Sequence, residues 1–412
     1  MRHDTDSTPL RQFPGDSART FLGAGRPGAA RSLYIHVPFC FHKCHYCDFY
    51  SIVDTRDRQE AFTDRLIREL IAIAPLAGDP LWTVFVGGGT PTLLRTDLWE
   101  RLLDTLHRHW AISPETEFTV ECNPETATPE LFGVLAGGGV NRISVGAQSF
   151  DPAHLKTLER WHDPASVGRA LELAREAGIG RRSIDLIYAI PGQTTDELAS
   201  DLRTALALPV DHLSAYALTY EPGTAMTARL ERGLVHATPD DLEARMLSQV
   251  LETVRSHGFE RYEVSNFALP GAECRHNLAY WRQDNWLAAG PSASGHLDGR
   301  RWKNTPRLDT YLGFDDAGFA PIVDHETPDA ARNLAERIMT GIRLHEGLDA
   351  PGLLQDASAI GPGASDRLRR QAERHRSNGW LEETGPRWRL TDAGYLFADR
   401  VAGDLMHALS GV

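Results

Sequence analysis

Residues 34–50 read Y-I-H-V-P-F-C-F-H-K-C-H-Y-C-D-F-Y, and this stretch decides the fold. Within it Cys40, Cys44 and Cys47 form the pattern C-x-x-x-C-x-x-C. Thiolates are the soft ligands that iron–sulfur clusters and zinc select. The two remaining cysteines, Cys122 and Cys274, lie far away in the sequence. Because three thiolates can hold three irons of a [4Fe–4S] cube and leave the fourth iron open, the spacing predicts a cluster with one open iron.

Two other uses of these cysteines have to be weighed. A zinc site usually shows paired C-x-x-C knuckles or a later H-x-x-x-H. Neither pattern is present, but His42 and His45 lie inside the loop and could complete a zinc tetrahedron, so zinc stays open. A structural disulfide is disfavoured in a chain of 412 residues with five cysteines and no export signal. Unpaired cysteines favour a reducing compartment.

A glycine run follows the next apolar segment. Trp82 to Val86 reads as a strand that leads directly into Gly87-Gly88-Gly89-Thr90-Pro91. Glycines let the backbone approach a ligand closely, although a glycine run after a strand is often only a tight turn.

With this run, the cysteine loop closely resembles the radical S-adenosylmethionine (SAM) proteins, in the group of coproporphyrinogen III dehydrogenases and HemW-type heme chaperones. The resemblance implies that SAM chelates the open iron and is cleaved to a 5′-deoxyadenosyl radical by one electron. It also implies SAM contacts from Tyr34 and the backbone around Tyr46, and from Gly88, Gly89 and Thr90 to the SAM amino group. The dehydrogenases carry a further cysteine two positions after the third, where this chain and HemW proteins have Phe49.

Strand-like and helix-like segments alternate up to about residue 218. The expected strands are Leu33–Val37, Trp82–Val86, Phe118–Glu121, Arg142–Gly146, Ser183–Ile190 and His212–Leu218. Helical stripes lie between them, as in Arg58–Ala74 with its apolar Phe62, Leu66, Leu70 and Ile73. Such alternation predicts βα units with parallel pairing. Six units indicate an α/β fold, the incomplete (β/α)6 barrel that is usual in the resembled superfamily.

Polar side chains stand at the ends of several of these strands. They are Glu121, Gln148, Arg160 and Asp185. A single acid after a strand is usually a helix cap, but residues at the carboxyl ends of barrel strands tend to be functional. The resemblance implies SAM contacts for all four. Cys122 is expected to be a small core residue, and Ala189 stands where the family usually has glycine.

A second motif, H-N-x-x-Y-W, spans His276 to Trp281. It is typical of the HemW group and is missing from the dehydrogenases. Histidine is a common axial ligand of heme iron and aromatic side chains stack on porphyrins, so His276 is a candidate heme ligand. Alternatively, His276 forms a hydrogen bond within a neighbouring turn while Tyr280 and Trp281 pack at a domain junction.

The chain length favours more than one domain. We expect a flexible tail over residues 1–30, a partial barrel over 31–270, a connecting segment over 271–320 and a winged-helix-like domain over 321–412. In the last domain, Ala331–Ile342 and Ala364–Ser377 read as helices, followed by a hairpin around Gly385-Pro386 and a helix over Ala393–Leu409. Residues 259–268 read as a strand that could close the open side of the barrel.

Charge and hydrophobicity limit the possible partners. The formal net charge of −13 argues against a nucleic-acid binder, and no apolar run is long enough to span a bilayer. We expect a cytoplasmic heme chaperone with a [4Fe–4S] cluster and SAM, whose partners are heme, acceptor hemoproteins and an electron donor. The alternatives are an oxygen-independent coproporphyrinogen III dehydrogenase, which Phe49 disfavours, and a radical enzyme that opens the heme macrocycle. Whether the chain is an enzyme stays open.

Overall fold

The computed structural model describes residues 17–23 and 26–410, which divide into two compact units. The first contains the described residues up to Phe41, then Tyr50–Thr116 and Asn285–Thr327. The second contains His42–Phe49, Glu117–Asp284 and the described residues from Pro328 onward. The cysteine loop therefore contributes Cys40 to the first unit and Cys44 and Cys47 to the second.

The first unit is built on six strands in the order β12-β11-β10-β9-β1-β2. Its strands are β1 (Ser32–Val37), β2 (Thr83–Gly88), β9 (Trp286–Ala289), β10 (Ser294–Leu297), β11 (Arg300–Asn304) and β12 (Ile322–Glu326). Its helices are α1 (Ala18–Leu22), α2 (Gln59–Ile73), α3 (Thr96–His109) and α11 (Leu308–Gly313), with 3-10 turns at Ala74–Leu76 and Pro91–Leu93. Strand β1 pairs in parallel with both β2 and β9, and β9 to β12 pair antiparallel.

The predicted stripe of α2 packs as expected, since its four apolar residues are fully buried. Strand β1 is buried on both faces, as parallel strands of α/β proteins usually are. Burial of these apolar side chains fixes the start of the cysteine loop at the end of β1.

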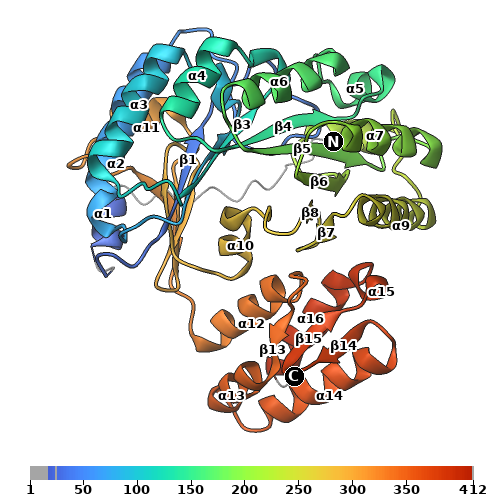
Figure 1. Ribbon diagram of the computed structural model, residues 1–412. Helices are drawn as coiled ribbons and strands as arrows, with labels where there is room; N and C mark the ends of the chain where they lie inside the picture. Colours follow the sequence, from blue (N-terminus) through green and yellow to red (C-terminus); the bar gives the residue numbers. More distant parts are fainter. Residues whose placement is uncertain (1–16, 24–25, 411–412) are drawn as a thin grey trace, which may run out of the picture. The chain divides into compact units, whose positions relative to one another are not determined.

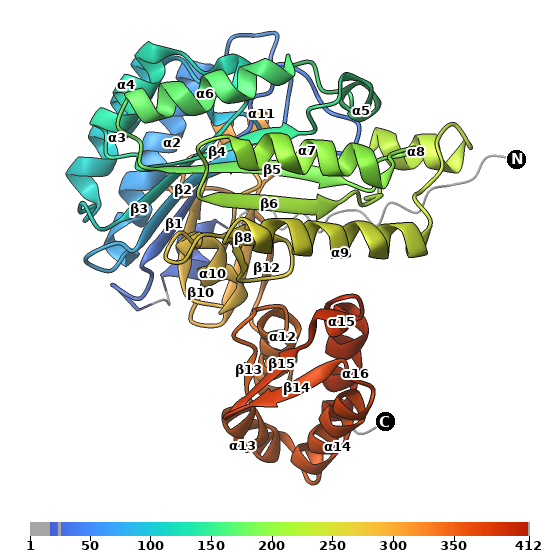
Figure 2. The same cartoon turned by 45° about the vertical axis from the view of Figure 1, so that its right-hand side comes forward.

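The second unit continues the βα alternation, with β3-β4-β5-β6 pairing in parallel. Its strands are β3 (Glu117–Cys122), β4 (Arg142–Gln148), β5 (Arg181–Tyr188), β6 (His212–Ala217), β7 (Glu260–Arg261) and β8 (Asn266–Ala268). Its helices are α4 (Pro129–Gly137), α5 (Pro152–Leu158), α6 (Pro164–Glu176), α7 (Thr195–Ala207), α8 (Ala225–Glu231), α9 (Asp240–Ser256) and α10 (Arg275–Trp281), with a 3-10 turn at Pro124–Thr126. Helices α6 and α7 lie along one face of these strands (Figure 2).

The C-terminal part of this unit has a hydrophobic core of its own. It consists of α12 (Ala330–Gly341), β13 (Leu348–Asp349), α13 (Ala350–Ile360), α14 (Ala364–Ser377), β14 (Leu381–Thr384), β15 (Arg387–Leu390), α15 (Asp392–Tyr395) and α16 (Ala398–Ser410). Helices surround the small sheet β13-β15-β14, drawn in orange and red in Figure 1. The predicted hairpin is β14–β15, whereas the predicted last helix is interrupted between α15 and α16.

Three segments contain secondary structure that differs in detail from the expectations. Within the supposed tail, Ala18–Leu22 form a helix because Ala18 and Leu22, four residues apart, both bury their side chains; residues 1–16 lie outside the described residues. The expected strand over 259–268 is split into β7 and β8, since Glu263 accepts a hydrogen bond from the Ser265 N–H and turns the chain. The segment expected to be a connection contains α10 and the strands β9 to β11.

Among residues 17–23 and 26–410, no helix has both the length and the hydrophobicity that crossing a bilayer requires.

Candidate functional site

In the first unit, the glycine run holds the start of the cysteine loop. The Thr90 N–H donates to the Phe39 carbonyl at 2.7 Å, and the Thr90 hydroxyl lies 3.6 Å from Cys40 Sγ. A Cβ on Gly89 would lie 2.7 Å from the same Phe39 carbonyl oxygen, so only glycine permits this approach. The predicted Gly89 and Thr90 therefore meet the predicted ligand Cys40.

His36 lies beneath this loop and was not singled out in the sequence. Its ring nitrogens hydrogen-bond the Tyr34 hydroxyl at 3.0 Å and the Tyr50 carbonyl at 2.8 Å. Burial lowers the pKa of His36 to about 4, so the imidazole is neutral at pH 7. Gly88 has φ +110° and packs on this ring, where a Cβ would come within 2.5 Å. His36 thus supports both Tyr34 and the first predicted SAM-contacting glycine.

In the second unit, backbone hydrogen bonds fix the remainder of the cysteine loop. The His45 N–H donates to the Leu158 carbonyl at 3.2 Å, and the His45 carbonyl accepts from Met226 N–H at 2.8 Å. Tyr46 packs against the apolar cluster that contains Leu158 and Met226, and burial raises the pKa of its hydroxyl. These contacts hold the loop at His45 and Tyr46, between Cys44 and Cys47.

Arg160 joins this loop to the end of β4. Its Nη1 lies 3.8 Å from Cys44 Sγ and its Nη2 donates to the Gly146 carbonyl at 2.6 Å. Gln148 has φ +65°, and a Cβ on Gly146 would lie 2.8 Å from its Nε2. The predicted Gln148 and Arg160 therefore meet over Gly146, and the Arg160 guanidinium places positive charge beside a predicted cluster ligand.

The two predicted acids lie on β3 and β5, the two strands that flank β4. Glu121 is near the end of β3 and is in register with Ser144 of β4. The Ser144 hydroxyl donates to the Asp185 carboxylate on β5, at 3.0 and 3.2 Å from its two oxygens. Loss of water around Asp185 raises the pKa of its carboxyl, and hydrogen bonds from Ser214 and Ser144 act in the opposite direction. Glu121 thus lies next to the last residue of β3, as expected, whereas Asp185 lies three residues before the end of β5 rather than at the end itself.

Ala189 follows Asp185 in the loop after β5 and has φ +59°. This is the left-handed region that favours glycine. The conformation explains why a glycine is usual at this position in the resembled family.

His276 occupies a different place. It lies in α10 with only 1% of its surface exposed, and its Nε2 hydrogen-bonds the Tyr280 hydroxyl at 2.9 Å. Its backbone N–H donates to Glu117, the first residue of β3. Because Glu117 and Glu121 are four residues apart on one strand, roughly 13 Å separates them. The motif therefore lies at the amino ends of the strands, away from Asp185, and makes the local hydrogen bond anticipated as the alternative.

A buried chain of hydrogen bonds continues from this motif into the sheet. Asn277 Nδ2 lies 3.4 Å from the Tyr262 hydroxyl, which hydrogen-bonds His212 Nε2 at 2.8 Å. His212 Nδ1 in turn lies 2.7 Å from the Ser183 hydroxyl. His276, through Glu117, and Asn277, through Tyr262, thus connect α10 to the strands of this unit.

The two cysteines outside the loop do not resemble ligands. Cys122 is buried, as predicted, and its thiol contacts the Asn123 carbonyl. Burial raises the pKa of the Cys274 thiol to about 12, so a thiolate is strongly disfavoured there. All five cysteines lie within the described residues, and none of them forms a disulfide.

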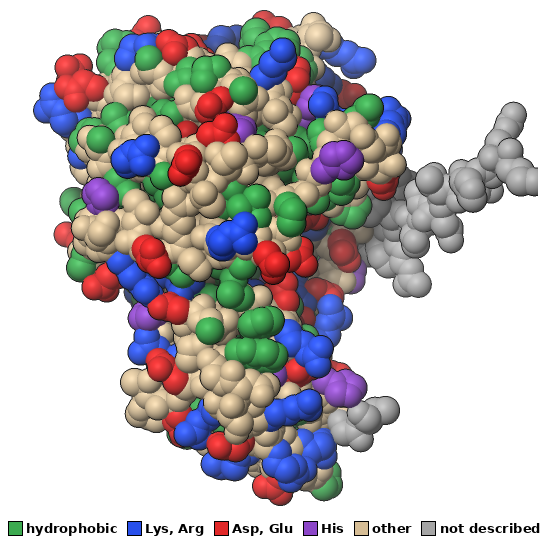
Figure 3. Space-filling view, turned by 90° about the vertical axis from the view of Figure 1, so that its right-hand side faces the viewer, with side chains coloured by type: hydrophobic (Ala, Val, Ile, Leu, Met, Phe, Trp, Pro, Cys, Tyr) green, Lys and Arg blue, Asp and Glu red, His purple; other side chains and the backbone are tan. Residues whose placement is uncertain are grey.

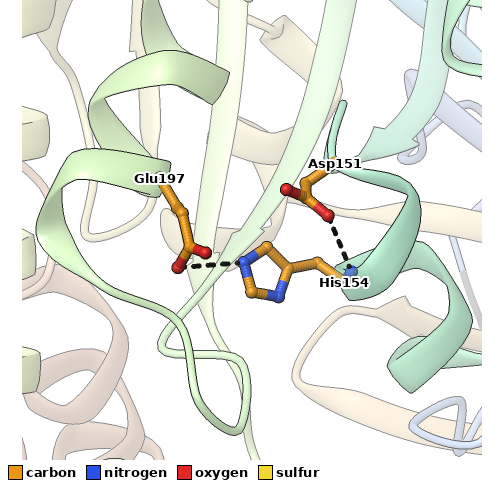
Figure 4. Close-up of side chains that lie close together, drawn as sticks. All are labelled: Asp151, His154 and Glu197. Atoms are coloured by element: carbon orange, nitrogen blue, oxygen red, sulfur yellow. Dashed lines mark hydrogen bonds and ion pairs between the residues drawn. The ribbon is translucent and has the colours of Figure 1, made fainter.

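A separate group of metal-ligand side chains lies where α5 meets α7 (Figure 4). It consists of Asp151, His154 and Glu197, whose ligand atoms lie within 4.8 Å of one another. Asp151 caps α5 and Glu197 forms the capping box of α7 with Thr194. His154 Nε2 lies 3.4 Å from the Glu197 carboxylate. Helix capping and an ion pair account for this group without a metal.

Comparison with known proteins gives the family. Residues 34–205 match the radical SAM superfamily, and residues 329–397 match the HemN C-terminal domain. A protein named heme chaperone HemW from Mycobacterium tuberculosis is 38% identical over 391 residues, covering 93% of this chain and 96% of that protein. The chain belongs to the HemW family of radical SAM proteins. The resemblance that the cysteine loop indicated is confirmed.

Other HemW relatives agree over most of the chain. The Bacillus subtilis protein is 36% identical over 321 residues, covering 77% of this chain and 84% of that protein. The Escherichia coli protein is 34% identical over 376 residues, covering 89% of this chain and 95% of that protein. The solved structure of coproporphyrinogen III oxidase (HemN) from Escherichia coli aligns with a TM-score of 0.81 at 22% identity, covering 95% of this chain and 93% of that one. This likeness confirms the radical SAM fold, and membership of the superfamily implies a [4Fe–4S] cluster and SAM.

Proposed function

We propose that this HemW-family chain is a heme chaperone, which binds heme, delivers it to acceptor hemoproteins and carries a SAM-binding [4Fe–4S] cluster. The observation that carries the proposal is the 34–38% identity to proteins named heme chaperone HemW over most of the chain. Phe49 supports it, because it stands where the dehydrogenases have a further cysteine, and a phenylalanine cannot ligate iron.

Cys40, Cys44 and Cys47 are the proposed cluster ligands. The thiol donor set suits iron, and two groups already face it, the Thr90 hydroxyl at Cys40 and the Arg160 guanidinium at Cys44. The Arg160 guanidinium beside Cys44 would partly balance the negative charge of a thiolate-held cluster. When bound, a reduced cluster with one open iron supplies the electron for SAM cleavage.

The proposed SAM-contacting residues of the first unit are Tyr34, Gly88, Gly89 and Thr90. Those proposed in the second unit are Tyr46, Glu121, Gln148, Arg160 and Asp185. The acids and the amide suit ammonium and ribose hydroxyl groups, and Arg160 suits a carboxylate. In each unit these side chains are held by the hydrogen bonds and close contacts described above.

His276 is the proposed heme ligand of the H-N-x-x-Y-W motif. Its Nε2 forms a hydrogen bond with the Tyr280 hydroxyl. Burial away from water lowers the pKa of His276 to about 3. The ring is therefore neutral, as an iron ligand must be. Ligation through Nε2 requires the Tyr280 hydrogen bond to open, so Tyr280→Phe should ease heme binding if His276 is the ligand.

Two assays on one preparation test the proposal. The chain is reconstituted anaerobically with iron and sulfide, then titrated with heme and incubated with coproporphyrinogen III, reductant and SAM. We expect heme binding and no decarboxylation. Formation of protoporphyrinogen would instead establish the dehydrogenase, and opening of the heme macrocycle would establish the third function considered.

A further inference from the structure

A hollow of about 290 Å³ lies beside the cysteine loop, in the second unit. It is formed by the end of α5, the turn that follows and the start of α6. Its lining residues are Pro152, Leu155, Lys156, Glu159, Arg160, Trp161, His162 and Pro164. Its volume is at the lower end of the range for ligand pockets. A ligand larger than this hollow would lie partly outside it.

Trp161 is the main apolar surface of this hollow, and 66% of it is exposed. One face of the indole stacks on the His42 ring, with centroids 4.3 Å apart and planes 14° from parallel. The indole N–H donates to Glu159 at 3.2 Å. The side chain is thus held in one orientation while most of its aromatic surface faces water. Such a pre-ordered aromatic surface binds a flat ligand at little entropic cost.

The polar groups around the indole favour an acidic ligand. Lys156 is exposed at the hollow, and Arg160 lines it with the guanidinium that also reaches Cys44. The one acid of the lining, Glu159, is turned toward His42 and His45, at 3.7 and 3.8 Å from their Nε2 atoms. Carboxylates of a ligand would therefore meet two cations.

His162 is a polar group in the wall of the hollow. It lines the hollow with 6% of its surface exposed, and its ring forms a hydrogen bond with the Ala147 carbonyl. The other ring nitrogen forms no side-chain hydrogen bond and is left for a ligand or water.

We propose that this hollow is a docking place for a flat, carboxylate-bearing tetrapyrrole, stacked on Trp161 and paired with Lys156 and Arg160. The inference rests on the proposed heme function and adds a contact separate from His276. Trp161 follows α5 at the carboxyl end of β4, whereas His276 bonds to Glu117 at the amino end of β3. Since Arg160 lines the hollow and contacts Cys44, a ligand there would lie beside the cluster loop.

Heme titration of the reconstituted protein tests the inference with matched variants. Trp161→Ala should weaken heme binding about tenfold, because aromatic stacking contributes on that scale, while Trp161→Phe should keep most of the affinity. Trp82→Ala is the control, since Trp82 is also an exposed tryptophan, at 45%, and lies in the other unit. Lys156→Glu should weaken binding of protoporphyrin IX but leave binding of its dimethyl ester unchanged.

The outcomes separate the two proposals. Wild-type protein that binds no heme overturns the proposed function and this inference with it. Wild-type protein that binds heme, with unchanged affinity in Trp161→Ala, overturns the docking place alone. Equal weakening in Trp161→Ala and Trp82→Ala shows a general effect of losing apolar surface and also overturns it. Cluster absorbance and circular dichroism confirm that each variant is folded.

Discussion

Replacing Asp185 with alanine should weaken SAM binding while the barrel strands stay folded. The Asp185 carboxylate accepts hydrogen bonds from Ser144, at 3.0 Å, and from Ser214, and it lies in the carboxyl half of β5 with acceptor capacity left for a ligand. A hydrogen bond from a ribose hydroxyl to a charged group contributes about 1.5–3 kcal/mol. Its loss corresponds to a roughly tenfold to hundredfold weaker SAM affinity.

Asp185→Asn is the matched variant. It keeps an acceptor oxygen for Ser144 but removes the charge, and neutral hydrogen bonds are about half as strong as charged ones. We expect a weakening of about three- to tenfold, between wild type and Asp185→Ala. Ser144→Ala removes the hydroxyl that donates to Asp185. It tests whether the weaker SAM binding of the Asp185 variants arises through the loss of this hydrogen bond.

Isothermal titration calorimetry with SAM on anaerobically reconstituted protein measures these affinities. Urea unfolding of each variant identifies any loss of stability, which a stranded Ser144 hydroxyl could cause. If Asp185→Ala binds SAM as tightly as wild type, with an intact cluster and the same unfolding midpoint, the assignment of Asp185 to the SAM site is refuted.

Three further results are expected. Cys44→Ser should abolish the absorbance of a reconstituted cluster, because oxygen replaces sulfur poorly at soft iron, while Cys122→Ser should retain it. Iron and zinc analysis checks this, and stoichiometric zinc without iron would refute the cluster. Burial lowers the pKa of His276 to about 3, whereas in the unfolded chain its pKa is near 6.5, so the unfolding free energy of the wild type should fall as the pH is lowered from about 6.5 to 3. His276→Gln should make this fall smaller. Urea titrations that show the same pH dependence for wild type and variant would contradict it. Gly88→Ala should destabilise the protein by roughly 1–3 kcal/mol, because a positive φ is strained for alanine and its Cβ would meet His36. An unchanged melting temperature would argue against the packing of Gly88 on His36.

Patterns local to the sequence predicted the parallel strands well. The strands β1 to β6 are apolar runs bounded by glycine or polar residues, and the stripe of α2 repeats every three or four residues. These signals depend only on neighbouring residues. The position of Glu121 near the end of β3 follows from the same reasoning, whereas β5 continues for three residues beyond Asp185.

What sequence reasoning missed depends on contacts between distant residues. The strand β11, R-R-W-K-N, exposes Lys303, half-buries Arg300 and Arg301, and buries Trp302 and Asn304. It falls within the segment 271–320 that we expected to be a connection. No local pattern shows that Glu117, more than 150 residues before His276, receives the N–H of that motif.

Side chains of both signs lie interspersed with apolar ones over much of the face drawn in Figure 3.

The hydrogen-bond chain from Asn277 through Tyr262 and His212 to Ser183 provides a spectroscopic reporter. Both ring nitrogens of His212 are engaged, and burial lowers its pKa well below 6.5, so the ring carries one sheltered proton. That proton should exchange slowly and give a resolved downfield resonance in nuclear magnetic resonance spectra. Any rearrangement of α10 that draws Asn277 and Tyr262 away would broaden or shift this signal. The resonance can therefore reveal whether the H-N-x-x-Y-W helix moves when heme is added, without a label on the motif itself.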